Sequence, residues 1–204
     1  MWNAVVLDMG ARLILVTGSP GSGKSTLAAR LAARYGCAVL DKDTIKEALF
    51  DALGAGAGSG GGPGTGTGAA GGSRRLSDAS FAVQFALAGP LLDCGATLVL
   101  EGNFRPGEHE APLARLLAAR PVPFAQVLLE APATLRAAQL AARAADPARH
   151  PGHADAAAAV PAAAAGALAL PGPLWRLAGD AGEAEFARLC GALDQWWSTS
   201  STSA

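Results

Sequence analysis

The 204-residue chain contains few cysteines, few aromatic residues and no long apolar segment. The three cysteines, Cys37, Cys94 and Cys190, are far apart and form no C-x-x-C pair, which indicates small core residues or free thiols in a reducing compartment. No stretch of about 18 apolar residues is free of glycine, proline and charge, which argues against a membrane-spanning helix. The first residues lack the basic and apolar regions of a signal peptide, so a cytoplasmic location is expected.

Charge of either sign is also scarce. Sixteen basic residues against seventeen acidic ones give a formal charge of −1, so the composition provides no broad basic surface for nucleic acid. A short basic channel that binds nucleic acid is the alternative to such a broad surface. The three histidines, His109, His150 and His153, do not combine with the isolated cysteines into a metal-ligand spacing.

Against these absences, residues 13–27 (LILVTGSPGSGKSTL) carry a strong pattern. Four apolar residues from Leu13 to Val16 predict a strand buried on both faces, and the Ala- and Leu-rich segment from Ser25 to Tyr35 predicts a helix. Between them, residues 18–25 match G-x-x-x-x-G-K-[ST], and this order of strand, glycine loop and helix predicts a phosphate-binding loop. The alternative is a glycine-rich turn with an exposed lysine.

The residue types of this loop suit a polyphosphate. Its glycines allow successive main-chain N–H groups to turn inward, and the helix N-terminus adds partial positive charge. Lys24 is expected to reach the β and γ phosphates of ATP, and the Ser25 hydroxyl to ligate Mg²⁺. The predicted nucleotide-binding residues are Gly18, Ser19, Pro20, Gly21, Ser22, Gly23, Lys24, Ser25 and Thr26.

The rest of the chain alternates strands with helices, which predicts an α/β fold with a parallel sheet covered on both faces. Residues 54–73 are almost all Gly, Ala, Ser, Thr and Pro and are expected to form a mobile loop. We expect an N-terminal extension over residues 1–10, one domain over 11–197 and a disordered tail over 198–204. Strands are expected at 37–40, 96–101, 123–130 and 174–177, and helices at 44–53, 76–92, 111–119, 133–144, 154–168 and 182–197.

Several polar residues follow the predicted strands directly. Gly18, the segment 41–43 and Glu101 each stand at the carboxyl end of a strand, where ligands of parallel sheets gather. We therefore expect these three groups to form one site.

The residues near this site favour phosphoryl transfer over other uses of a nucleotide. The chain has only two asparagines, neither in an N-K-x-D guanine reader, and it has no S-G-G-Q-like sequence of an ABC-type motor. Asp43 is placed to accept the proton of an incoming hydroxyl. Alternatively, or in addition, Asp43 caps the helix expected from Thr44. Lys46, three residues on, could meet an anionic group of the acceptor or be an ordinary solvated lysine.

Four segments together resemble a known family: GSPGSGKST, LDKDTIKE, TLVLEGNF and RHPGH. They are similar to the P-loop kinase-like ATPases often named AAA family ATPase, a group that resembles polynucleotide kinase, gluconate kinase, zeta toxin and chloramphenicol phosphotransferase. The resemblance covers most of residues 13–177. It implies a P-loop NTPase three-layer sandwich with a five-stranded parallel sheet and a helical lid at about 133–168.

The resemblance also implies roles for individual residues. In polynucleotide kinase, an acidic residue in an N-R-D-D-type segment is the general base, and a basic residue three positions on contacts substrate; the matching positions are Asp43 and Lys46. The chain departs from that segment in having Asp41 in place of Asn and Thr44 in place of the second Asp.

Lid arginines of such kinases close on the transferring phosphate, and Arg143 matches best, followed by Arg136 and Arg149. Solvated arginines on a surface helix are the alternative. Glu101 could hold a Mg²⁺-bound water or orient the acceptor, and His150 and His153 are not expected to bind metal.

The sequence thus predicts an ATP- and Mg²⁺-dependent kinase that phosphorylates a hydroxyl of a small molecule such as a metabolite or antibiotic. Asp43, Lys24 and Arg143 are the expected catalytic residues. Asp41, Lys46, Glu101 and Arg149 are the expected acceptor-side residues. A polynucleotide 5′-hydroxyl kinase and a non-catalytic nucleotide-binding regulator are the alternatives, and the oligomeric state is left open.

Overall fold

A computed structural model describes residues 10–53, 69–151 and 166–200. Its centre is a sheet of five strands in the order β2-β3-β1-β4-β5, and all four neighbouring pairs are parallel. The predicted five-stranded parallel sheet is therefore confirmed. The strands are β1 (Arg12–Gly18), β2 (Ala38–Asp41), β3 (Thr97–Glu101), β4 (Phe124–Glu130) and β5 (Leu174–Ala178).

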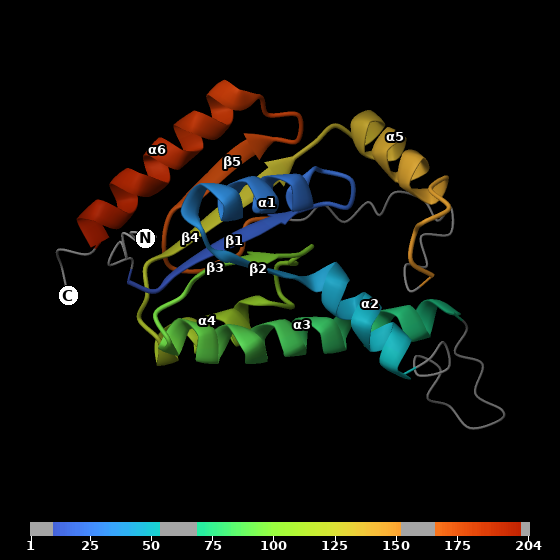
Figure 1. Ribbon diagram of the computed structural model, residues 1–204, viewed down its shortest axis with the longest axis horizontal. Coiled ribbons are helices and arrows are strands. Elements are labelled where there is room, and N and C mark those ends of the chain that lie inside the picture. Colours follow the sequence, from blue (N-terminus) through green and yellow to red (C-terminus); the bar gives the residue numbers. More distant parts are fainter. Residues whose placement is uncertain (1–9, 54–68, 152–165, 201–204) are drawn as a thin grey trace, which may run out of the picture.

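Helices cover both faces of the sheet and its carboxyl edge (Figure 1). One face is covered by α1 (Lys24–Tyr35) and α6 (Glu183–Ser200), and the other by α3 (Ala69–Asp93) and α4 (Glu110–Ala119). The two remaining helices, α2 (Lys42–Leu53) and α5 (Ala133–Ala144), lie where the strands end. None of the helices in the described ranges combines the length and apolarity that a membrane crossing demands.

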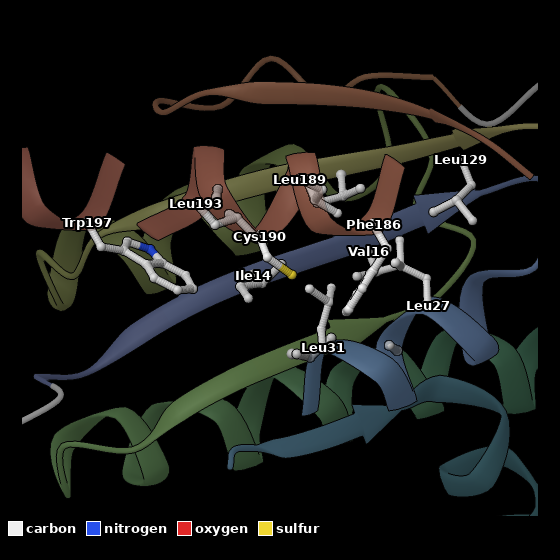
Figure 2. Packing of buried hydrophobic residues seen from close by; sticks show 14 residues of the cluster. Ile14, Val16, Leu27, Leu31, Leu129, Phe186, Leu189, Cys190, Leu193 and Trp197 are labelled. Atoms are coloured by element: carbon white, nitrogen blue, oxygen red, sulfur yellow. The ribbon is translucent and has the colours of Figure 1, made fainter. Parts of the chain in front are cut away.

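The apolar run of β1 divides between two cores, as its position in the middle of the sheet requires. Ile14 and Val16 pack with side chains of α1 and α6, including Leu31, Leu193 and Trp197 (Figure 2). Leu13 and Leu15 point to the opposite face and pack with α3 and α4. All four β1 side chains are completely buried, which confirms a strand covered on both faces.

The helix after β2 begins earlier than expected, and a different residue caps it. The Asp41 carboxylate accepts hydrogen bonds from the main-chain N–H groups of Asp43 (3.0 Å) and Thr44 (3.1 Å) and from the Thr44 hydroxyl (2.7 Å). These bonds satisfy the first N–H groups of α2, so the helix begins at Lys42. The alternative in which Asp43 caps this helix is therefore wrong, and the Asp43 carboxylate instead accepts a hydrogen bond from Lys42 Nζ.

Three other segments differ from the prediction in their extent. Helix α3 begins at Ala69, so the glycine-rich loop predicted over 54–73 ends earlier; alanines 69 and 70 have high helix propensity and extend the helix. Helix α6 runs to Ser200 instead of ending at 197, and Ser198 and Ser200 donate side-chain hydrogen bonds to carbonyls one turn back (2.8 and 2.9 Å).

The helix expected at 154–168 does not include its last residues. Residues 166–168 have no regular structure, because Leu168 is tied to the Gln126 side chain of β4 by two reciprocal hydrogen bonds of 3.2 Å. The rest of that prediction, the loop over 54–68 and His153 fall on residues outside the described ranges.

Candidate active site

The glycine-rich loop between β1 and α1 is packed tightly against three other segments. Gly21 has φ 73°, and a Cβ there would lie 2.8 Å from the carbonyl oxygen of Arg136 in α5. Gly23 has φ 88°, and a Cβ there would lie 2.9 Å from the carbonyl oxygen of Gly179 after β5. At Gly18, a Cβ would lie 2.6 Å from the Leu129 carbonyl oxygen of β4. The loop conformation thus depends on glycine for both backbone freedom and space.

Two polar side chains at the start of α1 face the site predicted from the sequence. Lys24 is buried, and its Nζ donates a hydrogen bond to the Ser19 carbonyl oxygen (3.0 Å). The Ser25 hydroxyl donates to Glu101 Oε2 at the end of β3 (3.2 Å). The Ser22 hydroxyl is buried and has no hydrogen-bond partner among the described residues. A loop of this form presents N–H groups, a buried cation and an unsatisfied hydroxyl, which is the donor set that binds phosphate.

Glu101 lies between the phosphate-binding loop and β2. The sheet register pairs it with Asp41 on one side and with Val16 on the other. Burial raises the pKa of Glu101 to about 8, the hydrogen bond and negative charge of Asp41 add to this rise, and the Lys24 ammonium opposes it. Burial lowers the pKa of Lys24, an effect that the Glu101 carboxylate opposes. This buried group of charges lies where the anion of a nucleotide and its cation would enter.

Helix α2 contributes three charged side chains from its first two turns. Lys42 is buried, and its Nζ donates a hydrogen bond to Asp43 Oδ1 (2.9 Å) while lying 5.9 Å from the Phe81 ring centroid. Lys46 is also buried, one turn further along α2. Burial lowers the pKa of Lys46, and the positive charge of Lys42 lowers it further.

A cavity of about 310 Å³ brings these groups together at the carboxyl edge of the sheet. The predicted residues that line it come from the phosphate-binding loop, from α2, from the end of β3 and from the segment of α5 and its following loop. They are Pro20, Gly21, Ser22, Gly23, Lys24, Ser25, Asp43, Lys46, Glu101, Arg143 and Arg149.

The other predicted residues lie outside this lining. Gly18 packs against the Leu129 carbonyl oxygen of β4, and the Ser19 carbonyl oxygen accepts the hydrogen bond from Lys24. Asp41 caps α2. Arg136 lines none of the described cavities, although its carbonyl packs on Gly21. His150 Nε2 lies 2.9 Å from Asp51 Oδ1 of α2, away from the lining.

A second cavity, of about 290 Å³, lies on the other side of the phosphate-binding loop. It is lined by Thr26 and Arg30 of α1 and by the segment 177–179 at the end of β5. Arg143 lines both cavities, so it stands where the two spaces meet. A nucleotide whose phosphates lie on the loop would have room for its nucleoside in this second cavity.

Sequence reasoning missed six residues that line the first cavity: Lys42, Ser77, Gly102, Asn103, Arg105 and Leu140. Lys42 stands beside Asp43 in the LDKD segment, and Asn103 and Arg105 follow β3 directly, so their places at strand ends could have indicated them. Ser77 lies on α3, and no sequence pattern points to it.

Mg²⁺ is the metal ion that a phosphate-binding loop of this kind implies, and the residues present fit it. Hydroxyl and carboxylate oxygens are the ligands that Mg²⁺ prefers, and the Ser25 hydroxyl and the Glu101 carboxylate meet in the cavity. Within the described ranges no group of three or more His, Cys, Asp or Glu side chains could hold a metal ion by itself. A site with one or two protein ligands, completed by phosphate oxygens, matches the usual way in which Mg²⁺ is bound.

The model of a family described as AAA domain matches residues 13–165. The chain belongs to the AAA domain family. This membership confirms the resemblance inferred from the four sequence segments, and it implies ATP as the nucleotide of this P-loop kinase-like domain. Among curated proteins, none matches the chain.

Solved structures share the fold of this chain. A protein of Chloroflexus aurantiacus J-10-fl, named "putative kinase", is 26% identical, with a TM-score of 0.73 over 92% of this chain and 98% of that one. A sugar kinase from Janibacter sp. HTCC2649 is 16% identical, with a TM-score of 0.58 over 91% of this chain and 95% of that one. APS kinase of Mycobacterium tuberculosis, in complex with AMPPNP and APS, is 21% identical, with a TM-score of 0.56 over 91% and 98%. At these identities the last two show the fold alone.

Proposed function

We propose that this AAA domain is an ATP-dependent kinase that transfers the γ-phosphoryl group to a hydroxyl of a small molecule, with Asp43 as the general base. One observation carries the proposal. The phosphate-binding loop, Asp43 and Arg143 line one cavity, and Arg143 also lines the second cavity. Phosphoryl transfer requires these three elements in one space: a cradle for the donor, a proton acceptor and a cation for the transferring group.

The donor side holds the triphosphate by main-chain and side-chain donors. N–H groups of the loop and the N-terminus of α1 surround the β phosphate, and Lys24 places its ammonium against the β and γ phosphates. Arg143 stands between the two cavities and neutralises charge that develops on the γ-phosphoryl oxygens. Mg²⁺, held by Ser25 and through Glu101, would neutralise charge on the phosphate oxygens when bound.

The acceptor side removes one proton. As the acceptor oxygen forms its bond to the γ phosphorus, the bond from that phosphorus to the bridging oxygen breaks and ADP leaves. The hydroxyl proton passes to the Asp43 carboxylate. Lys42 positions this carboxylate through the 2.9 Å hydrogen bond to Oδ1, and the burial of Lys42 against Phe81 fixes the ammonium itself.

The named neighbours support a small acceptor. Two structures that share the fold are named for small molecules, a sugar kinase and an APS kinase. A cavity of about 310 Å³ matches the size of small-molecule sites.

The test is a transfer assay with γ-labelled ATP and a panel of hydroxylated metabolites, antibiotics, nucleosides and 5′-hydroxyl oligonucleotides. Parent protein is expected to label one or more small molecules. The Asp43→Asn protein is expected to be slower by about 10²- to 10⁴-fold with the same acceptor, the usual contribution of a general base. Asp194→Asn, which changes an exposed carboxylate of α6 that pairs with Arg34 of α1, is the matched control and should retain the parental rate.

Each other outcome contradicts a particular part of the proposal. Parental turnover by Asp43→Asn contradicts the base assignment. Labelling of oligonucleotides alone, with salt-sensitive binding, would show a polynucleotide 5′-hydroxyl kinase instead. Tight ATP binding with no labelled product, unaffected by Asp43→Asn, would show a nucleotide-binding regulator.

A further inference from the structure

A buried glutamine of α3 joins two of the strands that carry the candidate site. Gln84 is completely buried, and its Nε2 donates hydrogen bonds to the main-chain carbonyl oxygens of Leu40 in β2 (2.6 Å) and Glu101 in β3 (2.9 Å). An amide nitrogen carries two N–H groups, so one side chain satisfies both carbonyls. The opposite orientation of the amide would place its oxygen against two carbonyl oxygens, so the two acceptors also determine how the amide is turned.

The oxygen of the same amide is left without a donor. Oε1 of Gln84 is buried, and no residue in the described ranges forms a hydrogen bond with it. A buried acceptor without a partner costs free energy, and such atoms are rare in folded proteins. An apolar side chain at residue 84 would avoid this cost, but it would leave both carbonyls without these donors.

The two strand ends that Gln84 joins place different parts of the site. Asp41 ends β2 and caps α2, which carries Asp43 in its first turn. Glu101 ends β3, and its side chain accepts the hydrogen bond from the Ser25 hydroxyl at the start of α1 (3.2 Å). Gln84 therefore connects the segment that places the proposed base with the segment that contacts the phosphate-binding loop.

The strand that leads to Asp43 is held by few other interactions. β2 has four residues, none of them fully buried, and it lies at the edge of the sheet with β3 as its neighbour. In contrast, β3 is buried throughout and pairs with both β1 and β2. A short edge strand with few buried contacts is among the first parts of a domain to open. The bridge through Gln84 is therefore important for the position of Asp43 relative to the donor.

Other contacts of α3 are made at the same junction. The ring centroid of Phe81, three residues before Gln84, lies 5.9 Å from Lys42 Nζ, which donates a hydrogen bond to Asp43. Gly102, the first residue after β3, has so little space that an added Cβ would lie 3.0 Å from Cε1 of Phe81. One helix thus contacts both the first turn of α2 and the end of β3.

We propose that Gln84 is a positioning residue of the phosphoryl-transfer site, which holds the ends of β2 and β3 together and thereby fixes Asp43 relative to the donor phosphates. This role rests on the proposed kinase function. Gln84 lines none of the described cavities, so it acts through the main chain of Leu40 and Glu101 and not by contact with a substrate. A misplacement of about 1 Å at a reacting group can lower a rate about a hundredfold.

Two variants of Gln84 keep its size and remove its donors. Gln84→Met has no N–H group, and Gln84→Glu, when ionised, places an oxygen against the two carbonyls. With an acceptor found by the transfer assay, each should lower kcat by about ten- to a hundredfold. The KM for ATP should stay within about twofold of the parent, because the phosphate-binding loop has packing contacts of its own.

Ser80→Ala is the matched control for both variants. Ser80 is another completely buried polar residue of α3, but its hydroxyl donates a hydrogen bond to the Leu76 carbonyl oxygen within the helix. Its loss removes a buried hydrogen bond without removing a contact with β2 or β3, so kcat should stay within about twofold of the parent.

Hydrogen exchange measures the same role without any substrate. Peptides that cover β2 and the start of α2, residues 38–46, should exchange at least about tenfold faster in Gln84→Met and Gln84→Glu than in Ser80→Ala. Peptides from α6, which packs on the opposite face of the sheet from α3, should exchange alike in all three variants.

Parental exchange over residues 38–46 in both Gln84 variants overturns the proposal, as does a parental kcat in both. A loss of protection that is equally large in α6, or a KM for ATP that rises as much as kcat falls, would show a general structural defect and also overturns it. If exchange over 38–46 rises as expected but the parent phosphorylates no compound, the kinase function fails, and the connection of the two strand ends by Gln84 stands.

Discussion

The two sides of the first cavity are built in different ways. The donor side is one continuous segment, residues 18–25, whose main chain is held by contacts at Gly18, Gly21 and Gly23 with β4, α5 and the segment after β5. The acceptor side is a set of side chains from separate elements, with Lys42, Asp43 and Lys46 on α2 and the arginines on two loops.

This difference has a physical consequence. Main-chain N–H groups bind the phosphates, which all triphosphates share. The glycines of this loop allow almost no substitution, because a Cβ at these positions would meet backbone atoms of other segments. A wall of side chains can be exchanged one residue at a time without disturbing the sheet. We infer that the donor side determines that phosphoryl transfer takes place, and that the acceptor side determines what is phosphorylated.

The largest expected effect is on the donor side. Lys24→Ala should reduce transfer by about 10²- to 10³-fold or more with every acceptor, because the lost ammonium stabilises the donor phosphates whatever receives them. The measurement is the initial rate of labelled transfer with two unrelated acceptors, after circular dichroism has shown that the variant is folded. If Lys24→Ala lost transfer to only one of the two acceptors, the inference that the donor side acts independently of the acceptor would be contradicted.

The next effect is on the positioning of the base. Lys42→Met should lower kcat by about ten- to a hundredfold, because it removes the charged hydrogen bond that fixes Asp43. The KM for ATP should stay within about twofold of the parent, and the pH profile of kcat should shift, which a purely structural defect would not produce. Lys42→Arg, which keeps a cation, should recover part of the activity; an unchanged kcat in Lys42→Met would contradict the positioning role.

A pair of glycine variants separates backbone strain from contact. Gly21→Ala and Gly36→Ala both place alanine in the left-handed region, at φ 73° and 61°, but only at residue 21 would the new Cβ meet another segment. Gly36→Ala should cost about 1 to 2 kcal/mol of unfolding free energy without changing ATP affinity. Gly21→Ala should add the clash with Arg136 and weaken ATP binding by about tenfold, which is about 1.4 kcal/mol. Equal ATP affinities in the two variants would show that the packing of α5 on the loop does not matter.

The smallest effect concerns the loop that carries Arg105. His109 Nδ1 accepts a hydrogen bond from the Arg105 main-chain N–H (2.8 Å), and burial lowers the pKa of His109 below its usual 6.5. The unfolded chain therefore binds more protons than the folded one below pH 6.5, so stability should fall as the pH drops through that range, by at most about 1.4 kcal/mol per pH unit. His109→Asn should flatten this dependence in urea unfolding between pH 7 and 5; an unchanged slope would assign the acid sensitivity to other groups.

Much of the fold could be predicted from the sequence, because local patterns and tertiary packing agree there. The apolar run at the start of β1, followed by a glycine-rich loop, is typical of a strand buried on both faces, and α5 begins and ends where its composition predicts, at 133 and 144. The start of α2 and the C-terminal end of α6 could not be predicted, because Asp41 and Asp43 are equally good caps by type and the hydroxyls at the end of α6 bond to carbonyls that only the folded helix supplies.

The candidate site also has a part that the sequence predicts and a part that it does not. The donor loop follows from one short motif, since its residues are contiguous and its chemistry is fixed by glycine, lysine and serine. Ser77 could not be assigned, because its place in the cavity depends on how α3 packs against the other elements that line it. The capping of α2 by Asp41 could not be predicted either: its oxygens accept hydrogen bonds from the first residues of α2, and Asp41 lies outside the cavity lining.

A crystal structure with AMPPNP and Mg²⁺ tests the central claim most directly. We expect the triphosphate on the loop over residues 18–25, its γ phosphate between Lys24 and Arg143, and the Asp43 carboxylate facing that phosphate across the cavity. A triphosphate bound elsewhere, or an Asp43 side chain turned away from the γ phosphate with the nucleotide in place, would contradict it.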